Sequence, residues 1–250
     1  MKQSNSKKKI AVIGLKGLPA FGGAATVGEN IIEQLKDKYE FTVLSVASHT
    51  EKHNKNYKGV RQIVFRAFGN GGVNTLLYYI QSMFFVLFHS YDLIHLHHAA
   101  SGYITPFLRL KYKVLVTLHG LNRINDPKFS SRQNAFFRYS EKQNLLKTNK
   151  VISVSKYDAE YLMEKYKRRV DYIPNGIKIQ EYNQVNKASD DYILFAAGRI
   201  YDIKGLHLVL KALHTVSTPI KLLVAGDLNQ VSEYRNEIMQ LSADLNIEFL

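Results

Sequence analysis

Hydrophobic and polar positions along this chain switch repeatedly between two periods. Short apolar runs such as Ile10-Ala11-Val12-Ile13 are typical of buried strands, and apolar residues three to four positions apart, as at Val27, Ile31 and Leu35, are typical of helices. Their alternation predicts a parallel sheet covered by helices. The expected strands are 9–14, 41–46, 62–68, 92–96, 113–118, 151–154, 170–173, 192–196, 221–225 and 247–250, and the expected helices are 24–35, 74–88, 100–110, 132–147, 156–166, 206–216 and 231–245.

The alternation is interrupted once, by a polar stretch without a clear period at residues 177–191. We interpret this stretch as a linker between two α/β domains. A disordered tail is expected at 1–7, a first Rossmann-like domain at 8–176 and a second at 192–250. The second domain is expected to be incomplete, because about three strands are only half of a doubly wound sheet.

The longest apolar stretch runs from Leu76 to Phe88. As a helix it would reach about 20 Å, against about 30 Å for the hydrocarbon core of a bilayer. We therefore expect a core helix, and a helix lying in the membrane interface is the alternative. The basic residues at 7–9 resemble the start of a signal peptide, but Lys16 interrupts the apolar run that follows, so a first strand is expected there.

Charge changes the picture more than overall composition does. The net charge is +13, and residues 1–185 hold 28 Lys and Arg against 13 Asp and Glu, whereas residues 186–250 hold 6 against 8. No helix-turn-helix, zinc-finger or RNP pattern accompanies this charge, so no nucleic-acid partner is expected. An anionic membrane surface is one expected partner, through Lys111, Lys113 and the cluster at 165–169; a solvated basic face is the other interpretation.

Cysteine is absent, which excludes disulfides and thiolate metal sites. The first candidate site is instead the glycine-rich loop 14–23, between the first strand and the first helix. Glycine allows a ligand to approach the backbone, and the amino end of a helix favours an anion. The loop lacks the G-x-G-x-x-G fingerprint and an acidic residue placed for a ribose. A tight turn that packs helix on strand is the other interpretation.

Histidines follow two of the expected strands. His95, His97 and His98 end one strand, and His119 with Gly120 ends the next. Ligands bind at the carboxyl ends of strands in open α/β sheets, and histidine can donate or accept a hydrogen bond near neutral pH. The histidines lack the carboxylate partners of a typical metal site, so no metal is expected. Structural histidines at the rim of a cleft are the alternative.

Residues 197–205, Ala-Gly-Arg-Ile-Tyr-Asp-Ile-Lys-Gly, join an expected strand to an expected helix. The pattern predicts that the strand ends, that Gly198 opens a loop and that helix-terminal amides face a phosphate. Arg199 would add a planar fork and Lys204 a mobile charge, which together neutralise a diphosphate without a metal ion. Gly226 follows the next strand and is expected to face the same crevice. Two solvated surface cations are the other interpretation of Arg199 and Lys204.

Taken in order, these motifs resemble the retaining glycosyltransferases of the GT-B fold, in the large family 4 of bacterial cell-surface sugar transferases. The resemblance covers residues 9–250. It rests on the glycine loop, the His119-Gly120 strand end, Val154-Ser155-Lys156, Ile173-Pro174-Asn175-Gly176, Gly198-Arg199 with Lys204-Gly205, and Val224-Ala225-Gly226-Asp227.

The resemblance implies an α/β GT-B fold of two Rossmann-like domains facing across a cleft, with the acceptor on the first and a nucleotide-sugar donor on the second. Arg199 and Lys204 match residues that clamp the donor diphosphate, and His119 matches a histidine at the donor sugar. No cofactor or metal is implied. The implied catalytic residues are His119, Arg199 and Lys204; the donor-binding residues are Gly22, Gly23, Gly198, Arg199, Lys204 and Gly226; and the acceptor-side residues are His97, His98 and Asn175.

The expected function is transfer of a sugar, with retention, from a nucleotide-sugar donor to a bacterial cell-surface or lipid-linked glycan. The expected location is the cytoplasm, peripheral on the inner face of the cell membrane. The family's paired-glutamate motif would lie after Leu250, so the chain is expected to be a C-terminally truncated form. A non-catalytic fragment that binds a membrane or a partner is an alternative, and a nucleotide-binding oxidoreductase is a weaker one.

Overall fold

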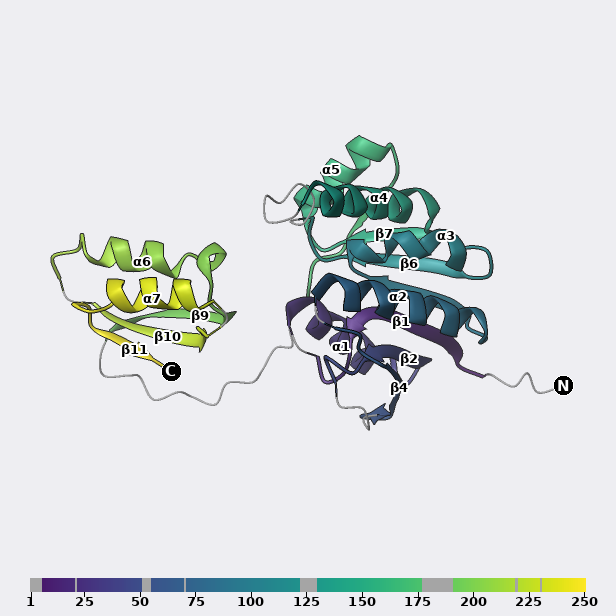
Figure 1. The fold of residues 1–250 in the computed structure, drawn as a ribbon, viewed down its shortest axis with the longest axis horizontal. Helices are drawn as coiled ribbons and strands as arrows, with labels where there is room; N and C mark the ends of the chain where they lie inside the picture. The colour runs from purple at the N-terminus through teal and green to yellow at the C-terminus, as the bar shows by residue number, and fades with distance from the viewer. Residues whose placement is uncertain are drawn as a thin grey trace. The chain divides into compact units, whose positions relative to one another are not determined.

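A computed structural model describes residues 6–20, 22–50, 55–69, 71–121, 130–176, 191–218, 220–229 and 231–250. The chain divides into two compact units, Met1–Lys178 (unit 1) and Ile179–Leu250 (unit 2), which we describe separately (Figure 1). Residues 1–5 of the expected tail and 177–190 of the expected linker lie outside the described residues.

Unit 1 is built on an eight-stranded sheet in the order β3-β4-β2-β1-β5-β6-β7-β8. Neighbouring strands are parallel throughout, except that β3 runs antiparallel to β4. The strands are β1 Lys8–Lys16, β2 Tyr39–Val46, β3 Asn56–Tyr57, β4 Val60–Phe65, β5 Leu93–His97, β6 Lys113–Leu118, β7 Lys150–Ser153 and β8 Asp171–Tyr172.

The order of the strands identifies where a ligand would enter this sheet. From β1 the chain moves outward through β2 and β4, and it then returns to the other side of β1 with β5. Such a reversal leaves a crevice at the carboxyl ends of the two strands that flank it, here β1 and β5. The glycine-rich loop follows β1, and His98 follows β5.

Helices cover both faces of the sheet in unit 1. On one face, α1 packs over a core that includes Val12, Ile32 and Val43. The remaining helices pack on the other face, over the larger core around Tyr78 and Leu96. The elements are α1 Gly23–Leu35, α2 Gly71–Leu87, the 3-10 segment η1 Ala99–Ile104, α3 Thr105–Leu108, α4 Ser131–Lys147 and α5 Lys156–Tyr166.

Unit 2 has a parallel three-stranded sheet in the order β11-β10-β9, with α6 and α7 on one face (Figure 1). The helices close over a core that includes Leu210, Val224 and Ile238. The elements are β9 Tyr192–Arg199, the 3-10 segment η2 Asp202–Lys204, α6 Leu206–Leu213, β10 Lys221–Asp227, α7 Ser232–Leu241 and β11 Ile247–Phe249.

The predicted α/β architecture is confirmed, three local predictions need correction, and one short strand was not predicted. The strand β9 continues through Gly198 and Arg199, which the sequence pattern placed in a loop. The helix predicted at 100–110 is a 3-10 segment followed by a single α-helical turn, and the helix predicted to end at 245 ends at Leu241. The short β3 had no apolar alternation to reveal it.

Candidate active site

The loop after β1 begins at a β-bulge. Pairing with β2 jumps from Ile13 to Lys16, so the residues between them leave the ladder. Gly14 has φ +112°, and an added Cβ would overlap the backbone carbonyl of His97 on β5. The Gly14 N–H donates to the Tyr78 hydroxyl at 2.8 Å, and that hydroxyl donates to the Leu44 carbonyl at 2.7 Å. Glycine is therefore required where β1 and β5 meet at the crevice.

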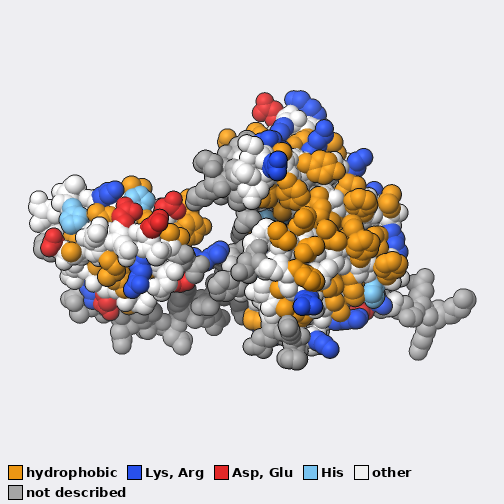
Figure 2. All heavy atoms as spheres, viewed as in Figure 1, with side chains coloured by type: hydrophobic (Ala, Val, Ile, Leu, Met, Phe, Trp, Pro, Cys, Tyr) orange, Lys and Arg blue, Asp and Glu red, His pale blue; other side chains and the backbone are white. Residues whose placement is uncertain are grey.

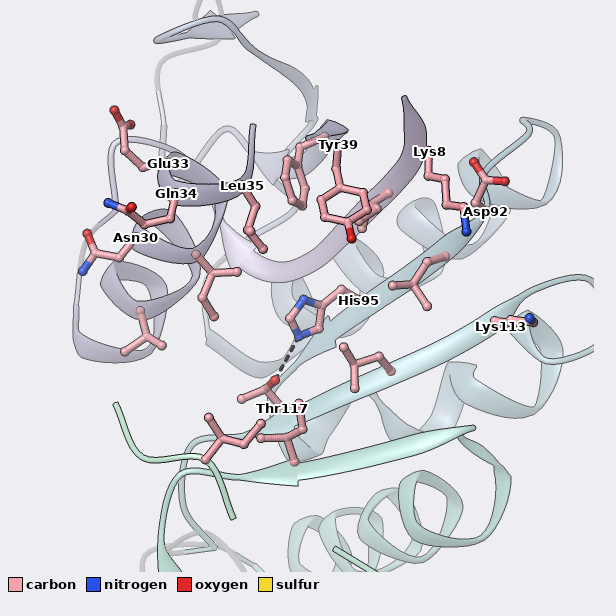
Figure 3. Close-up of a pocket in the computed structure, with 18 of the residues that line it drawn as sticks. Lys8, Asn30, Glu33, Gln34, Leu35, Tyr39, Asp92, His95, Lys113 and Thr117 are labelled. Atoms are coloured by element: carbon pink, nitrogen blue, oxygen red, sulfur yellow. Dashed lines mark hydrogen bonds between the residues drawn. The ribbon is translucent and has the colours of Figure 1, made fainter. Parts of the chain in front are cut away.

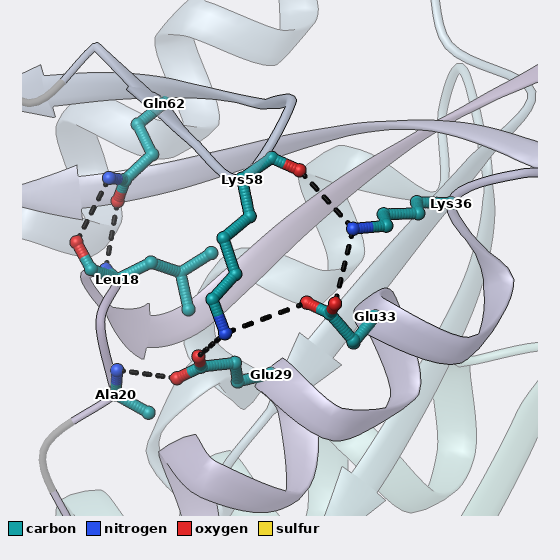
Figure 4. Close-up of polar contacts among 7 residues, drawn as sticks. All are labelled: Leu18, Ala20, Glu29, Glu33, Lys36, Lys58 and Gln62. Atoms are coloured by element: carbon teal, nitrogen blue, oxygen red, sulfur yellow. Dashed lines mark hydrogen bonds and ion pairs between the residues drawn. The ribbon is translucent and has the colours of Figure 1, made fainter.

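A buried glutamine from β4 holds the next part of this loop (Figure 4). Gln62 is 1% exposed; its Oε1 accepts from the Leu18 N–H at 2.8 Å, and its Nε2 donates to the Leu18 carbonyl at 3.0 Å. The hydroxyl of Ser45 donates to the same Oε1 at 2.8 Å. Both backbone groups of Leu18 are thus satisfied by one side chain, which fixes the path of the loop.

The first helix holds the loop from its other side. The Ala20 N–H donates to Glu29 Oε2 at 2.7 Å, and Lys58 Nζ lies 4.0 Å from Glu29 Oε1 and 3.9 Å from Glu33 Oε2 (Figure 4). The cation lies close to both carboxylates, so it offsets the negative charge that Glu29 brings to the loop. The loop is tied to β4 by Gln62 and to α1 by Glu29.

Two glycines end the loop at the start of α1. Gly22 is the N-cap, with φ +106°, a conformation that other residues adopt only with strain. Gly23 begins the helix, and an added Cβ there would have nothing within 4 Å. No side chain caps the amino end of α1 within the described residues. Its first backbone amides are therefore in the arrangement that suits an anion.

Three histidines stack at the carboxyl ends of β5 and β6. The His97 and His119 rings lie 5.3 Å apart at 14°, with Nδ1 of His97 3.0 Å from Nε2 of His119. The His95 ring lies 4.2 Å from that of His97, and its Nε2 lies 2.9 Å from the hydroxyl of Thr117. His119 Nδ1 is buried without a hydrogen-bond partner among the described residues. The chain of contacts fixes the orientation of the His119 ring.

Burial makes these histidines neutral at physiological pH. Burial lowers the pKa of His119 to about 4, and burial together with the charge of His119 lowers the pKa of His95 to about 4. The pKa of His97 is lowered well below its ordinary value, first by burial and then by the neighbouring histidines. Neutral imidazoles can both donate and accept hydrogen bonds. In the part of the chain that the structure describes, no cluster of three or more metal-ligating side chains is suited to hold a metal ion.

The other two acceptor-side candidates lie after β5 and after β8. His98, at φ +93°, directly follows β5 and begins η1. Asn175 is exposed after β8 and lines a cavity of about 1390 Å³ on the α1 face of the sheet. His95 and Thr117 also line this cavity, as Figure 3 shows. His95 of the histidine stack and Asn175 therefore line the same cavity.

In unit 2 the ends of β9 and β10 approach closely. Gly226 has φ +143°, and an added Cβ would overlap the carbonyl oxygen of Ala197 on β9. The register of the two strands shifts at this point, and Asp227 then pairs with Arg199. Gly198 is different, because its φ is not positive and an added Cβ would have nothing within 4 Å. The fold of unit 2 requires glycine at 226 but not at 198.

Arg199 and Lys204 are both exposed on unit 2, at the end of β9 and in η2. Neither forms an ion pair with any of the residues that the structure describes. Lys204 Nζ lies 6.0 Å from the ring centre of Tyr201. The two cations therefore stand at a strand's carboxyl end with their charge available to an anion.

One of the backbone amides expected to face a phosphate at the amino end of α6 has a side-chain partner. Gly205, in the left-handed conformation, is the N-cap of this helix. The N–H of His207 donates to the Tyr234 hydroxyl at 3.2 Å, and His207 Nδ1 lies 3.0 Å from the same oxygen. A side chain from α7 thus occupies an amide that the sequence pattern left for a ligand.

Three residues that shape the loop after β1 were not found from the sequence. Tyr78 lies in a long apolar stretch, and Gln62 and Glu29 lie in ordinary strand and helix patterns. A polar residue at an expected inward position of a strand, as Gln62 is, was the available signal. Its partner, the backbone of Leu18, is 44 residues away, so only the fold identifies it.

Comparisons with known proteins agree with this geometry. The family model described as Glycosyltransferase Family 4 matches residues 21–181. An uncharacterized glycosyltransferase of Methanocaldococcus jannaschii, MJ1178, is 28% identical over 214 residues, which are 84% of this chain and 58% of that protein. The chain thus spans less than two thirds of the length of this relative.

Solved structures show the same fold at low sequence identity. Sucrose-phosphate synthase from Thermosynechococcus elongatus matches with a TM-score of 0.77 and 20% identity, over 98% of this chain and 70% of that chain. Anabaena HepE, in complex with UDP and glucose, matches with a TM-score of 0.73 and 19% identity, over 97% of this chain and 69% of that chain. The fold is that of the GT-B glycosyltransferases. Because the family model covers more than half of its residues, the chain belongs to Glycosyltransferase Family 4.

Proposed function

We propose that this protein takes part in transferring a sugar from a nucleotide-sugar donor to a glycan acceptor, with retention of anomeric configuration. The observation that carries the proposal is the pair Arg199 and Lys204, exposed and unpaired among the described residues at the end of β9, in a chain of glycosyltransferase fold. HepE has been solved with UDP-glucose, which supports a nucleotide-sugar donor for a chain of the same fold.

Unit 2 supplies the charge for the donor diphosphate in this proposal. The bond between the anomeric carbon and the diphosphate oxygen breaks, and its electron pair moves to that oxygen. Arg199 and Lys204 stabilise the negative charge that develops there, which is electrostatic catalysis that uses no metal ion. Gly198, next to Arg199, has no Cβ, so a phosphate can approach the backbone closely. Gly226 supports this end of the sheet by its close contact with β9.

Unit 1 supplies backbone amides and a neutral imidazole. We assign the uncapped amino end of α1, with Gly22 and Gly23, to the donor phosphates. His119 is assigned to contact with the donor sugar, because its ring is partly exposed, oriented by His97 and neutral. An acceptor hydroxyl then attacks the anomeric carbon on the face that the diphosphate leaves, and its proton passes to the departing diphosphate oxygen. His97 and His98 are assigned to the acceptor side of this crevice, and Asn175 to the same side through the cavity that it lines.

The acceptor in this proposal is a cell-surface or lipid-linked glycan, met at the inner face of the cell membrane. The basic balance of residues 1–185 supports this assignment, because phosphorylated or membrane-held acceptors are anionic. Two cations of the cluster at 165–169 already have acidic partners in the fold. Lys165 Nζ lies 2.7 Å from Glu141, and Arg169 Nε lies 2.7 Å from Asp171.

Titration calorimetry with UDP tests the donor site. The Arg199→Ala and Lys204→Ala variants are each expected to bind UDP about 10-fold or more weakly than the parent, because each removes a charge-assisted contact to phosphate. The matched control is Arg235→Ala, which removes another exposed arginine of unit 2, on α7. Unchanged UDP affinity in both Arg199→Ala and Lys204→Ala would exclude the proposed diphosphate site.

A further inference from the structure

The helix α2 has two apolar faces, and only one of them is used by the core. Tyr78, Tyr79 and Val86 point inward and are at most 1% exposed. On the opposite face Phe84 is 53% exposed and Phe88, just after the helix, is 83% exposed. A helix that is apolar all round is normally buried all round. The outer face of α2 is thus apolar surface that the described fold leaves uncovered.

The uncovered surface continues over the neighbouring helices. In Figure 2 hydrophobic side chains gather on the side of unit 1 that carries α2, α3 and α4 in Figure 1. Two hydrogen bonds join α2 to its neighbours. The Tyr103 hydroxyl of η1 donates to the Leu76 carbonyl at 2.6 Å, and Lys111 Nζ, just after α3, donates to the Leu87 carbonyl at 2.8 Å. We call this surface the apolar face; its members are Val73, Leu76, Phe84, Phe88, Phe107, Leu110, Tyr139 and Leu146.

The exposed charges of the segments that carry the apolar face have a single sign. The segments 71–91, 99–111 and 131–147 contain one acidic residue, Glu141, which is fully buried and accepts from Lys165. The exposed cations among them include Lys142, which lies between Tyr139 and Leu146 on the outer side of α4, and Lys111 beside the end of α2. The remaining cations of these segments are Arg109, Arg132, Arg138 and Lys147.

An apolar surface bordered by cations fits an anionic lipid surface better than a second copy of the chain. In a twofold dimer the same patch meets itself, so Lys111 and Lys142 would face other cations with no exposed carboxylate on these helices to pair them. At a bilayer the aromatic and leucine side chains enter the interface, while lysine and arginine reach the phosphates of the headgroups.

We propose that the apolar face docks this protein on an anionic membrane, with Phe84 and Phe88 inserted at the headgroup level. This inference extends the membrane-held acceptor of the proposed function and specifies the surface that meets the lipid. The protein would lie on the membrane, since no helix in the described part of the chain is long and apolar enough to cross it. Both interpretations of this apolar stretch then apply to α2: its inner face belongs to the core, and its outer face lies in the membrane interface.

Co-sedimentation of the 250-residue chain with vesicles, without donor or acceptor, tests the docking surface. Phosphatidylcholine vesicles are compared with vesicles that also contain phosphatidylglycerol, at low and high salt. Binding is expected only to the anionic vesicles and to weaken with salt. The Phe84→Ser/Phe88→Ser variant is expected to partition about 10-fold or more weakly. The Lys111→Gln/Lys142→Gln variant is expected to lose about 5-fold per charge.

The control is Leu208→Ser, which removes a side chain that is 62% exposed on α6 of unit 2, and it should bind vesicles like the parent. Thermal melting of all variants separates loss of docking from loss of folding. Equal binding by the parent and the Phe84→Ser/Phe88→Ser variant would overturn the proposal. So would a dimer that the same substitutions dissociate in the absence of vesicles. Failure of UDP binding leaves this readout unaffected, so the two proposals fail separately.

Discussion

At the scale of single residues, the loop after β1 depends on polar side chains that never face solvent. Gln62 satisfies both backbone groups of Leu18, and the Tyr78 hydroxyl bridges Gly14 and Leu44. Buried polar groups that lose their partners are costly, so each of these side chains holds the loop more firmly than an exposed contact would. The position of the proposed donor amides is therefore set from inside the core.

Replacing Gln62 by alanine should loosen this loop. We expect the Gln62→Ala variant to lose about 1–3 kcal/mol of unfolding free energy, because the Leu18 N–H loses its acceptor and the Leu18 carbonyl keeps only the Thr50 hydroxyl as a donor. A weaker affinity for UDP is also expected if the loop positions donor amides. Urea unfolding and calorimetry measure the two effects. Gln81→Ala is the control, since Gln81 Nε2 makes only longer contacts, to the Arg66 carbonyl at 3.4 Å and the Leu77 carbonyl at 3.2 Å; equal losses in both variants would contradict the prediction.

The histidine stack makes stability depend on pH. An unfolded histidine titrates near 6.5 and folded His95 near 4, so between these values the unfolded chain binds more protons and stability falls as the pH falls. His95 should contribute a loss of about 2 kcal/mol between pH 7 and pH 5. Full stability is present above about pH 6.5. Below about pH 4 folded His95 is itself protonated, so this histidine causes no further loss of stability.

The measurement is urea unfolding of the parent and of His95→Asn at the two pH values. The pH dependence should be smaller in the variant by the contribution of one histidine. His89→Asn is the matched control, because it removes an exposed histidine from the same unit. Identical pH dependence in the parent and in His95→Asn would show that burial of this imidazole carries no such linkage.

At the scale of elements, the two glycines near the end of the β9–β10 pair have different functions. Gly226 is required by the backbone, because a Cβ there would overlap the Ala197 carbonyl at a φ of +143°. Gly198 has open space and an ordinary φ, so the fold itself does not explain it. A glycine without a structural requirement beside Arg199 is what a ligand that approaches the backbone would need.

The two alanine variants separate these requirements. Gly226→Ala should destabilise unit 2 by at least about 2 kcal/mol through strain and overlap. Gly198→Ala should change stability by less than about 0.5 kcal/mol, yet weaken UDP binding because its methyl group occupies the space of a phosphate. Thermal melting and calorimetry give the two readouts. Full UDP affinity in Gly198→Ala would remove Gly198 from the proposed donor site.

The sequence predicted the positions of helices and strands better than their pairing partners and the burial of their faces. The β-branched runs and the helical spacing located the sheet strands because each pattern depends only on neighbours in the chain. The extension of β9 to Arg199 was missed because glycine and arginine carry no strand pattern, and the pairing of Arg199 with Asp227 decides it. The sequence left open whether α2 is buried all round or lies in an interface, because apolar residues on both sides of a helix do not indicate which side is covered.

At the scale of the whole molecule, charge and site residues are divided between the units. Arg199 and Lys204 lie in a segment that is acidic overall, whereas the basic balance belongs to residues 1–185. The sequence order of the motifs predicted the glycosyltransferase family, and the family model confirms it. Contacts such as Gln62 with Leu18, or Tyr78 with Gly14, join positions 44 and 64 residues apart, so spacing along the chain could not reveal them.

The contact between Gly14 and Tyr78 has a consequence for how this protein can diverge. Tyr78 belongs to the helix that carries the apolar face. Its hydroxyl accepts from the N–H of Gly14, the glycine of β1 that lies against the His97 carbonyl of β5. A lineage that changes its acceptor can vary the tips of its loops freely. It cannot replace Gly14, because an added Cβ would overlap the His97 carbonyl, whereas the N–H that donates to Tyr78 is present in every residue except proline. In a set of homologous sequences position 14 should therefore remain glycine whether or not tyrosine occupies position 78.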